Sequence, residues 1–106
     1  MKLEFSKSAL ADLAFWKKAD RKMAERVTSL LLEILESPYV GKGRPEQLVG
    51  NLSGYWSRRI NSKDRIVYKV DEQMETVFIR SLRKHYEYKG QVVLTSGSQS
   101  GPSRRF

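Results

Sequence analysis

The residues of this chain whose types could do chemistry are a carboxylate, an arginine and a histidine–tyrosine pair. Glu46 is the only carboxylate in the glycine-spaced basic loop GKGRPEQL, and Arg65 opens the apolar run RIVYKV. His85, the single histidine of the chain, is followed directly by Tyr86. Side chains of these types can supply a general base, a permanent positive charge and a general acid.

Cleavage of RNA is a reaction that such a set can catalyse, because RNA carries its own nucleophile, the 2′-hydroxyl beside the scissile phosphate. The protein then needs a base near this hydroxyl, an acid near the leaving 5′-oxygen and cations around the phosphorane. We assign these roles to Glu46, His85 and Arg65. Histidine titrates at about 6.5 in model peptides, so it can release a proton near neutrality. Tyr86 completes the predicted catalytic set, as a platform on which a base can stack.

The charge of the chain is high and uneven. It has 106 residues, enough for one domain with a modest core, and a formal net charge of +8. Residues 42–69 hold seven basic side chains and only two acidic ones. Such a segment indicates a polyanionic partner, although the same excess would also keep a small protein in solution. Five of its cations are predicted to bind substrate: Lys42, Arg44, Arg58, Arg59 and Lys63.

Composition excludes several classes of function. The chain has no cysteine, which removes disulfides, thiolate metal sites and cysteine nucleophiles. With one histidine and no clustered carboxylates, we expect no protein-bound metal and no other cofactor. The N-terminus lacks the apolar core of a signal peptide, and no apolar run is long enough to span a membrane. We therefore expect a cytoplasmic protein with no membrane contact.

Helices and strands must position these residues. We predict helices over residues 7–18 and 21–36, with Ser6 and Asp20 as their N-caps. Strands are predicted at residues 2–5, 47–49, 54–60, 65–70 and 76–82, with tight turns at 61–64 and 71–74. The expected fold class is α+β, with two N-terminal helices packed on one face of a mostly antiparallel, twisted sheet.

Each assignment has a structural alternative. Glu46 can be a surface carboxylate paired with Arg44, and His85 a polar residue at the end of a strand. Arg65 is harder to explain in this way, because burying a lone cation is costly. Three aromatic residues are better explained as core or dimer-interface residues than as platforms for bases: Tyr55, Trp56 and Tyr68. The glycines of GKG suit a connecting turn as well as a phosphate-binding loop, and the spacing is not that of a P-loop.

Five stretches together carry a resemblance to a known family. They are the opening MKL, the loop GKGRPEQL, the run NLSGYWSRRI, the strand DRIVY and the closing His-Tyr pair, within residues 1–86. The chain resembles the YoeB-type toxins of the RelE-like superfamily of toxin–antitoxin endoribonucleases. The resemblance implies cleavage of mRNA in the A site of the 70S ribosome, homodimerisation and neutralisation by a YefM-type antitoxin. By position, the family's general base matches Glu46, its phosphate-binding arginine Arg65, and its terminal pair His85 and Tyr86.

The end of the chain departs from the family pattern. Relatives stop at or just after the tyrosine, whereas twenty residues follow Tyr86 here. We divide the chain into a toxin-like domain, residues 1–89, and a basic, Ser/Gly-rich tail, residues 90–106, that is predicted to be disordered apart from a possible strand at 92–94. In addition, Val49 and Gly50 stand where the family commonly has a basic residue.

Two functions from different classes therefore remain. The first is a metal-independent endoribonuclease that leaves a 2′,3′-cyclic phosphate and a 5′-hydroxyl. The second is a non-catalytic module that binds RNA or the ribosome through the same basic strands. They differ over Glu46 and His85, which binding alone would not require.

Overall fold

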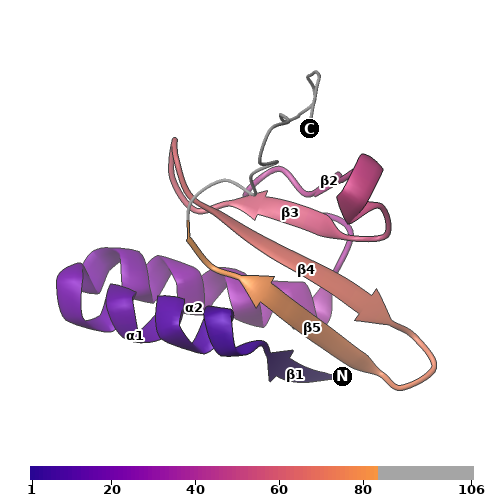
Figure 1. Ribbon diagram of the computed structural model, residues 1–106, viewed down its shortest axis with the longest axis horizontal. Helices are drawn as coiled ribbons and strands as arrows, with labels where there is room; N and C mark the ends of the chain where they lie inside the picture. The colour runs from indigo at the N-terminus through magenta and orange to yellow at the C-terminus, as the bar shows by residue number, and fades with distance from the viewer. Residues whose placement is uncertain (84–106) are drawn as a thin grey trace.

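Two helices lie side by side against one face of a five-stranded sheet, as Figure 1 shows. The computed structural model describes residues 1–83. The predictions for His85, Tyr86 and the tail, with its strand at 92–94, fall outside the described residues. The helices are α1 (Lys7–Ala19) and α2 (Arg21–Glu36). The strands are β1 (Lys2–Phe5), β2 (Glu46–Gln47), β3 (Trp56–Arg59), β4 (Arg65–Asp71) and β5 (Thr76–Ser81).

The sheet has the order β1-β5-β4-β3-β2. β1 pairs with β5 in parallel, and the other three pairings are antiparallel. Since β1 and β2 form opposite edges, the two helices carry the chain from one edge of the sheet to the other (Figure 1). The predicted α+β class, with both helices on one face of a mostly antiparallel sheet, is confirmed.

The helix boundaries follow from local capping chemistry. Ser6 Oγ accepts a hydrogen bond from the backbone N–H of Ala9 at 2.9 Å, which starts α1. Asp20 closes α1 and opens α2, where its carboxylate accepts from the N–H of Met23 at 3.2 Å. Both caps satisfy donors that a helix start leaves free. In the part of the chain that the structure describes, no helix is long and apolar enough to cross a membrane.

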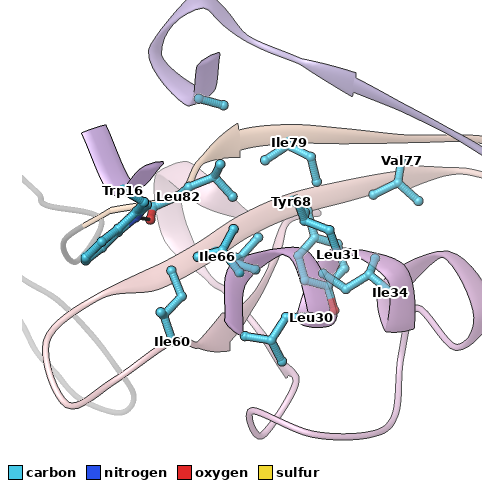
Figure 2. Close-up of a cluster of buried hydrophobic side chains, with 12 residues drawn as sticks. Trp16, Leu30, Leu31, Ile34, Ile60, Ile66, Tyr68, Val77, Ile79 and Leu82 are labelled. Atoms are coloured by element: carbon cyan, nitrogen blue, oxygen red, sulfur yellow. Dashed lines mark hydrogen bonds between the residues drawn. The ribbon is translucent and has the colours of Figure 1, made fainter. Parts of the chain in front are cut away.

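The main core lies between the helices and the sheet. Alternate residues of the strands point toward α2, and Figure 2 shows Tyr68 and Ile79 from the sheet close to Leu31 and Ile34. Tyr68 is fully buried, so the interpretation of this tyrosine as a core residue is confirmed. The alternation also leaves the intervening side chains on the other face of the sheet.

Among residues 1–83, the face of the sheet turned away from the helices carries a small second cluster. Leu48, Leu52 and Val67 are buried there, with Tyr55 packed against them. Around this cluster the exposed side chains include Arg59, Lys69 and Arg80. We call this side of the sheet the open face. It is the surface on which the candidate functional residues must be judged.

Candidate active site on the open face of the sheet

Glu46 and Arg65 meet on the open face, although they come from different strands. Glu46 pairs with Ser57 of β3, while Arg65 of β4 pairs with Arg59. The Nη1 atom of Arg65 lies 3.6 Å from Oε1 of Glu46. The Glu46 side chain is 41% exposed and that of Arg65 is 14% exposed. The predicted base and the predicted phosphate-binding arginine are therefore neighbours, and the ion pair is with Arg65 rather than with Arg44.

Arg65 has a donor without a partner. Its Nη1 atom is buried and makes no hydrogen bond within residues 1–83. The carboxylate of Glu46 at 3.6 Å is close enough for charge attraction but too far for a hydrogen bond. Ser57 Oγ is likewise buried and unpartnered among the described residues. Unpaired buried donors cost free energy, so an arginine in this state favours an oxyanion nearby.

The basic loop before β2 lies against β3. The backbone N–H of Arg59 donates to the carbonyl of Gly43 at 2.7 Å, and this contact places Lys42 and Arg44 at the edge of the site. A Cβ at Gly43 would lie 3.0 Å from the carbonyl oxygen of Arg59, and its φ is +83°, so a glycine suits this close approach. Lys42, Arg44 and Arg59 are all exposed, as the substrate-binding prediction requires.

Lys63 lies in the turn that joins β3 to β4. Asn61 Oδ1 accepts hydrogen bonds from the N–H groups of Lys63 and Asp64 at 2.8 Å and 2.7 Å, which fixes the tight turn predicted at 61–64. Lys63 is exposed at the end of the hairpin where Arg59 and Arg65 pair. Its position is compatible with a contact to a flanking phosphate, and that role stays a prediction.

The substrate-binding prediction for Arg58 is wrong. Its side chain is fully buried and points to the helix side of the sheet, where it forms an ion pair with Glu33 at 2.6 Å. The guanidinium makes five hydrogen bonds inside the protein, to Tyr68 Oη, Glu33 Oε1 and the carbonyl oxygens of Ser37, Val40 and Lys42. No donor of this arginine is left for a phosphate.

Arg58 instead holds the loop that leads to Glu46. Three of its acceptors are backbone carbonyls of residues 37–42, the segment that leads from the end of α2 into the basic loop. Glu33 adds a second tie, because the same Oε1 atom accepts from the N–H of Lys42 at 2.7 Å. A Cβ at Gly41, whose φ is +128°, would lie only 2.6 Å from this oxygen.

Tyr68 completes this loop anchor, which we define as Glu33, Arg58 and Tyr68. Its hydroxyl accepts from Arg58 Nε at 3.2 Å and donates to the carbonyl of Pro38 at 2.6 Å. Burial raises the pKa of Tyr68, while the nearby guanidinium acts in the opposite direction. The hydroxyl therefore stays protonated and able to donate. Neither Glu33 nor Tyr68 was singled out from the sequence as a residue that shapes the site.

Further cations lie near Tyr55 on the open face. Lys69 Nζ is 5.0 Å from the centroid of the Tyr55 ring, and the guanidinium carbon of Arg80 is 5.6 Å from it. The positive surface thus extends along β4 and β5, beyond the pair formed by Glu46 and Arg65. Within residues 1–83, no three acidic or histidine side chains are grouped so as to hold a metal ion.

Comparison with known proteins identifies the family. The sequence profile of the YoeB-like toxins of bacterial type II toxin–antitoxin systems matches residues 5–86. The chain belongs to this family. Toxin YoeB of Mycobacterium bovis is 44% identical over 86 residues, which are 81% of this chain and 96% of that relative.

Solved structures of related toxins agree with this assignment. The YoeB/ParE toxin from Agrobacterium tumefaciens matches with a TM-score of 0.78 at 37% identity, over 81% of this chain and 100% of that one. A heterotetrameric YoeB-YefM complex from Staphylococcus aureus matches with a TM-score of 0.72 at 39% identity, over 79% of this chain and 95% of that chain. A YoeB dimer from the same species gives 0.74 at 38% identity, over 81% and 98%.

Proposed function

We propose that this toxin is a metal-independent endoribonuclease that cleaves mRNA in the A site of the 70S ribosome. The observation that carries this proposal is the pairing of Glu46 with Arg65 at 3.6 Å on an exposed, cationic face of the sheet. A surface that only binds RNA gains nothing from a carboxylate beside its phosphate-binding arginine, because the carboxylate repels phosphate. A nuclease needs one there as a base.

The proposed reaction proceeds by attack of the 2′-hydroxyl on the adjacent phosphate. Glu46 takes the hydroxyl proton as the new bond between the 2′-oxygen and phosphorus forms. Arg65 holds the non-bridging oxygens through its permanent positive charge while negative charge builds on the phosphorane. His85 then protonates the 5′-oxygen as its bond to phosphorus breaks. The products are a 2′,3′-cyclic phosphate and a 5′-hydroxyl.

The surrounding side chains fit an extended polyanion. Arg59 pairs with Arg65, so a phosphate bound between them would meet two guanidinium groups at once. Lys42, Arg44 and Lys63 are exposed around this point and can contact flanking phosphates. Such contacts position the RNA and make its binding depend on salt concentration. Tyr86 is assigned to stack on a base next to the scissile phosphate.

We infer two protein partners from the related structures. The complex from Staphylococcus aureus contains YefM together with YoeB, and a YoeB dimer is known from the same species. A YefM-type antitoxin with an acidic segment would suit the basic residues of the open face, since its carboxylates can replace RNA phosphates. We propose that this antitoxin covers Glu46 and Arg65, and that the toxin is a cytoplasmic homodimer.

Substitution of Glu46 by glutamine separates catalysis from binding. The amide keeps the shape of the carboxylate but cannot act as a base, so cleavage of mRNA on translating ribosomes should fall by about 10²- to 10⁴-fold. Binding of RNA should be unchanged or slightly tighter, because a negative charge has been removed. Glu36→Gln, an exposed carboxylate at the end of α2, is the matched control and should cleave at the parental rate.

The outcome decides between the two classes of function. Loss of cleavage with retained binding supports the nuclease. If the parental protein binds RNA and ribosomes but cuts neither, it is a binding module and the nuclease proposal is wrong. If Glu46→Gln cleaves at the parental rate, cleavage uses another base.

A further inference from the structure

Side chains of helix α1 contact the backbone at the point where the chain leaves the sheet after β5. β5 ends at Ser81, and both backbone polar groups of the next residue, Leu82, are bound by α1 side chains. The N–H of Leu82 donates to Asp12 Oδ2 at 2.9 Å. The indole Nε1–H of Trp16 donates to the carbonyl of Leu82 at 2.7 Å, and this bond is buried.

The residue after Leu82 is held by the same helix. The guanidinium carbon of Arg83 lies 3.6 Å from the centroid of the Phe15 ring, and Phe15 packs edge-on against Trp16 at 5.2 Å between centroids. Residues three and four positions apart lie on one side of a helix. Asp12, Phe15 and Trp16 therefore form a single surface that holds two consecutive residues at the end of β5. We call these three side chains the α1 clamp.

Burial of the Leu82 side chain does not by itself need this arrangement. Leu82 is fully buried in the main core, and Figure 2 places it beside Trp16 at one end of the cluster. The two hydrogen bonds add directional control, because together they fix both the position and the orientation of the peptide groups on either side of Leu82.

Leu82, which the clamp holds, lies close in the sequence to the proposed general acid. His85 comes three residues after Leu82, and three residues of chain can span at most about 11 Å. The place of Leu82 thus limits where His85 can reach. An acid that must protonate a leaving oxygen has to be placed within hydrogen-bonding distance, and small misplacements are expensive in rate.

We propose that Asp12 and Trp16 are positioning residues that fix the point from which the chain delivers His85 to the scissile phosphate. The proposal rests on the proposed function, since it assumes that His85 is the acid. It assigns to α1, on the far side of the sheet from Glu46, an effect on the rate of the chemical step without any contact to RNA.

The test compares single-turnover cleavage rates of the full chain on ribosome-bound mRNA. Asp12→Ala removes the acceptor for Leu82, whereas Asp12→Asn retains an oxygen that can accept the same bond. Trp16→Phe retains most of the ring but loses the indole donor. Thr28→Val is the matched control. It also removes one hydrogen bond between a helix side chain and the backbone, because Thr28 Oγ1 donates to the carbonyl of Ala24 at 3.0 Å, but this bond lies away from the site.

We expect Asp12→Ala and Trp16→Phe to cleave about 10- to 100-fold more slowly, with RNA binding within about twofold of the parent. Asp12→Asn and Thr28→Val should stay within about threefold of the parental rate. All rates are measured at a temperature below the thermal unfolding midpoint of each variant. A clamp that serves only stability would lower that midpoint and leave the rate of the folded protein unchanged, and this outcome would overturn the proposal.

A double variant shows whether the effect passes through His85. If it does, adding Asp12→Ala to His85→Ala should cause no further loss of rate, because residues that act as a unit are non-additive. A full additional loss would contradict the proposal. If His85→Ala alone cleaves at the parental rate, the assignment of the acid fails, whereas a slow His85→Ala with a fast Asp12→Ala leaves the proposed function intact and rejects the clamp.

Discussion

Replacement of Arg58 by leucine tests whether the loop anchor holds the segment before Glu46. The substitution removes a buried guanidinium that makes five hydrogen bonds and leaves the carboxylate of Glu33 without its ion-pair partner. Three loop carbonyls, those of Ser37, Val40 and Lys42, lose their donor at the same time. The change therefore acts on stability and on the loop together.

The size of the effect follows from the burial of the two partners. Removing one partner of a buried ion pair costs about 3–5 kcal/mol. Glu33 is 29% exposed, and water can reach part of the loop, so we expect the lower end of this range, about 3 kcal/mol. A small domain loses about 1–2 kcal/mol of stability per molar urea, so the urea midpoint should fall by about 2 M.

The measurement is urea unfolding followed by tryptophan fluorescence, with Glu46→Gln in all proteins so that the proposed activity does not limit expression. Arg59→Leu is the matched control: it makes the same chemical change at the next position of β3, where the side chain is exposed. Its free energy of unfolding should lie within about 0.5 kcal/mol of that of the parent. If the midpoints of Arg58→Leu and Arg59→Leu agree, the loop anchor does not stabilise the fold as described.

Three further changes have defined outcomes. In Gly41→Ala the alanine is held at a positive φ and its Cβ lies 2.6 Å from Glu33, so the unfolding free energy should fall by about 1–3 kcal/mol. In Gly54→Ala the Cβ meets nothing within 4 Å, so this substitution should cost less. The hydrogen bond to Glu72 raises the pKa of Tyr39 from 10.0 to about 12. Glu72→Gln should lower this pKa in an absorbance titration, and the stability that the contact contributes should be present below pH 10 and lost as the pH rises to about 12. Arg65→Gln should weaken RNA binding and reduce the salt dependence of the binding constant by about one ion, and an unchanged slope would exclude a phosphate contact.

Within residues 1–83, local patterns in the sequence were sufficient for the two α-helices and the five strands, but not for the short 3-10 helix at Gly50–Leu52. Ser6 and Asp20 cap the helices where their side-chain chemistry indicated, and α2 has the predicted bounds. The strands begin or end within a few residues of the predicted positions, because alternation fixes the faces of a strand but not its last hydrogen bond.

Arg58 shows where charge misleads. The density of positive charge in residues 42–69 does not distinguish one basic residue from another, so Arg58 and Arg59 were assigned the same role. Alternation separates them, since it places Arg58 on the face of Trp56 and Ile60, which is the helix side. That signal was present in the sequence, and greater weight on it would have identified Arg58 as a buried residue.

Other features depend on contacts between distant residues. Glu33 reaches Arg58 across 25 positions, and Asp12 reaches Leu82 across 70. No local pattern indicates such pairs, because Glu33 and Asp12, taken alone, are ordinary charged residues of a helix. The chemistry of RNA cleavage and the family resemblance both assigned Glu46 and Arg65 to one site, but no local pattern predicts their contact, since it depends on the register of β2 and β4 against β3.

The chemical nature of the RNA ends decides whether the 2′-hydroxyl is the nucleophile. Ribosome-bound mRNA is cut with the parental toxin, and the new ends are analysed for cyclic phosphate and for 5′-phosphate. We predict a 2′,3′-cyclic phosphate on one fragment and a 5′-hydroxyl on the other, with neither produced by Glu46→Gln. Fragments with a 3′-hydroxyl and a 5′-phosphate would contradict the mechanism, because they would show that water, and not the 2′-hydroxyl, attacked the phosphate.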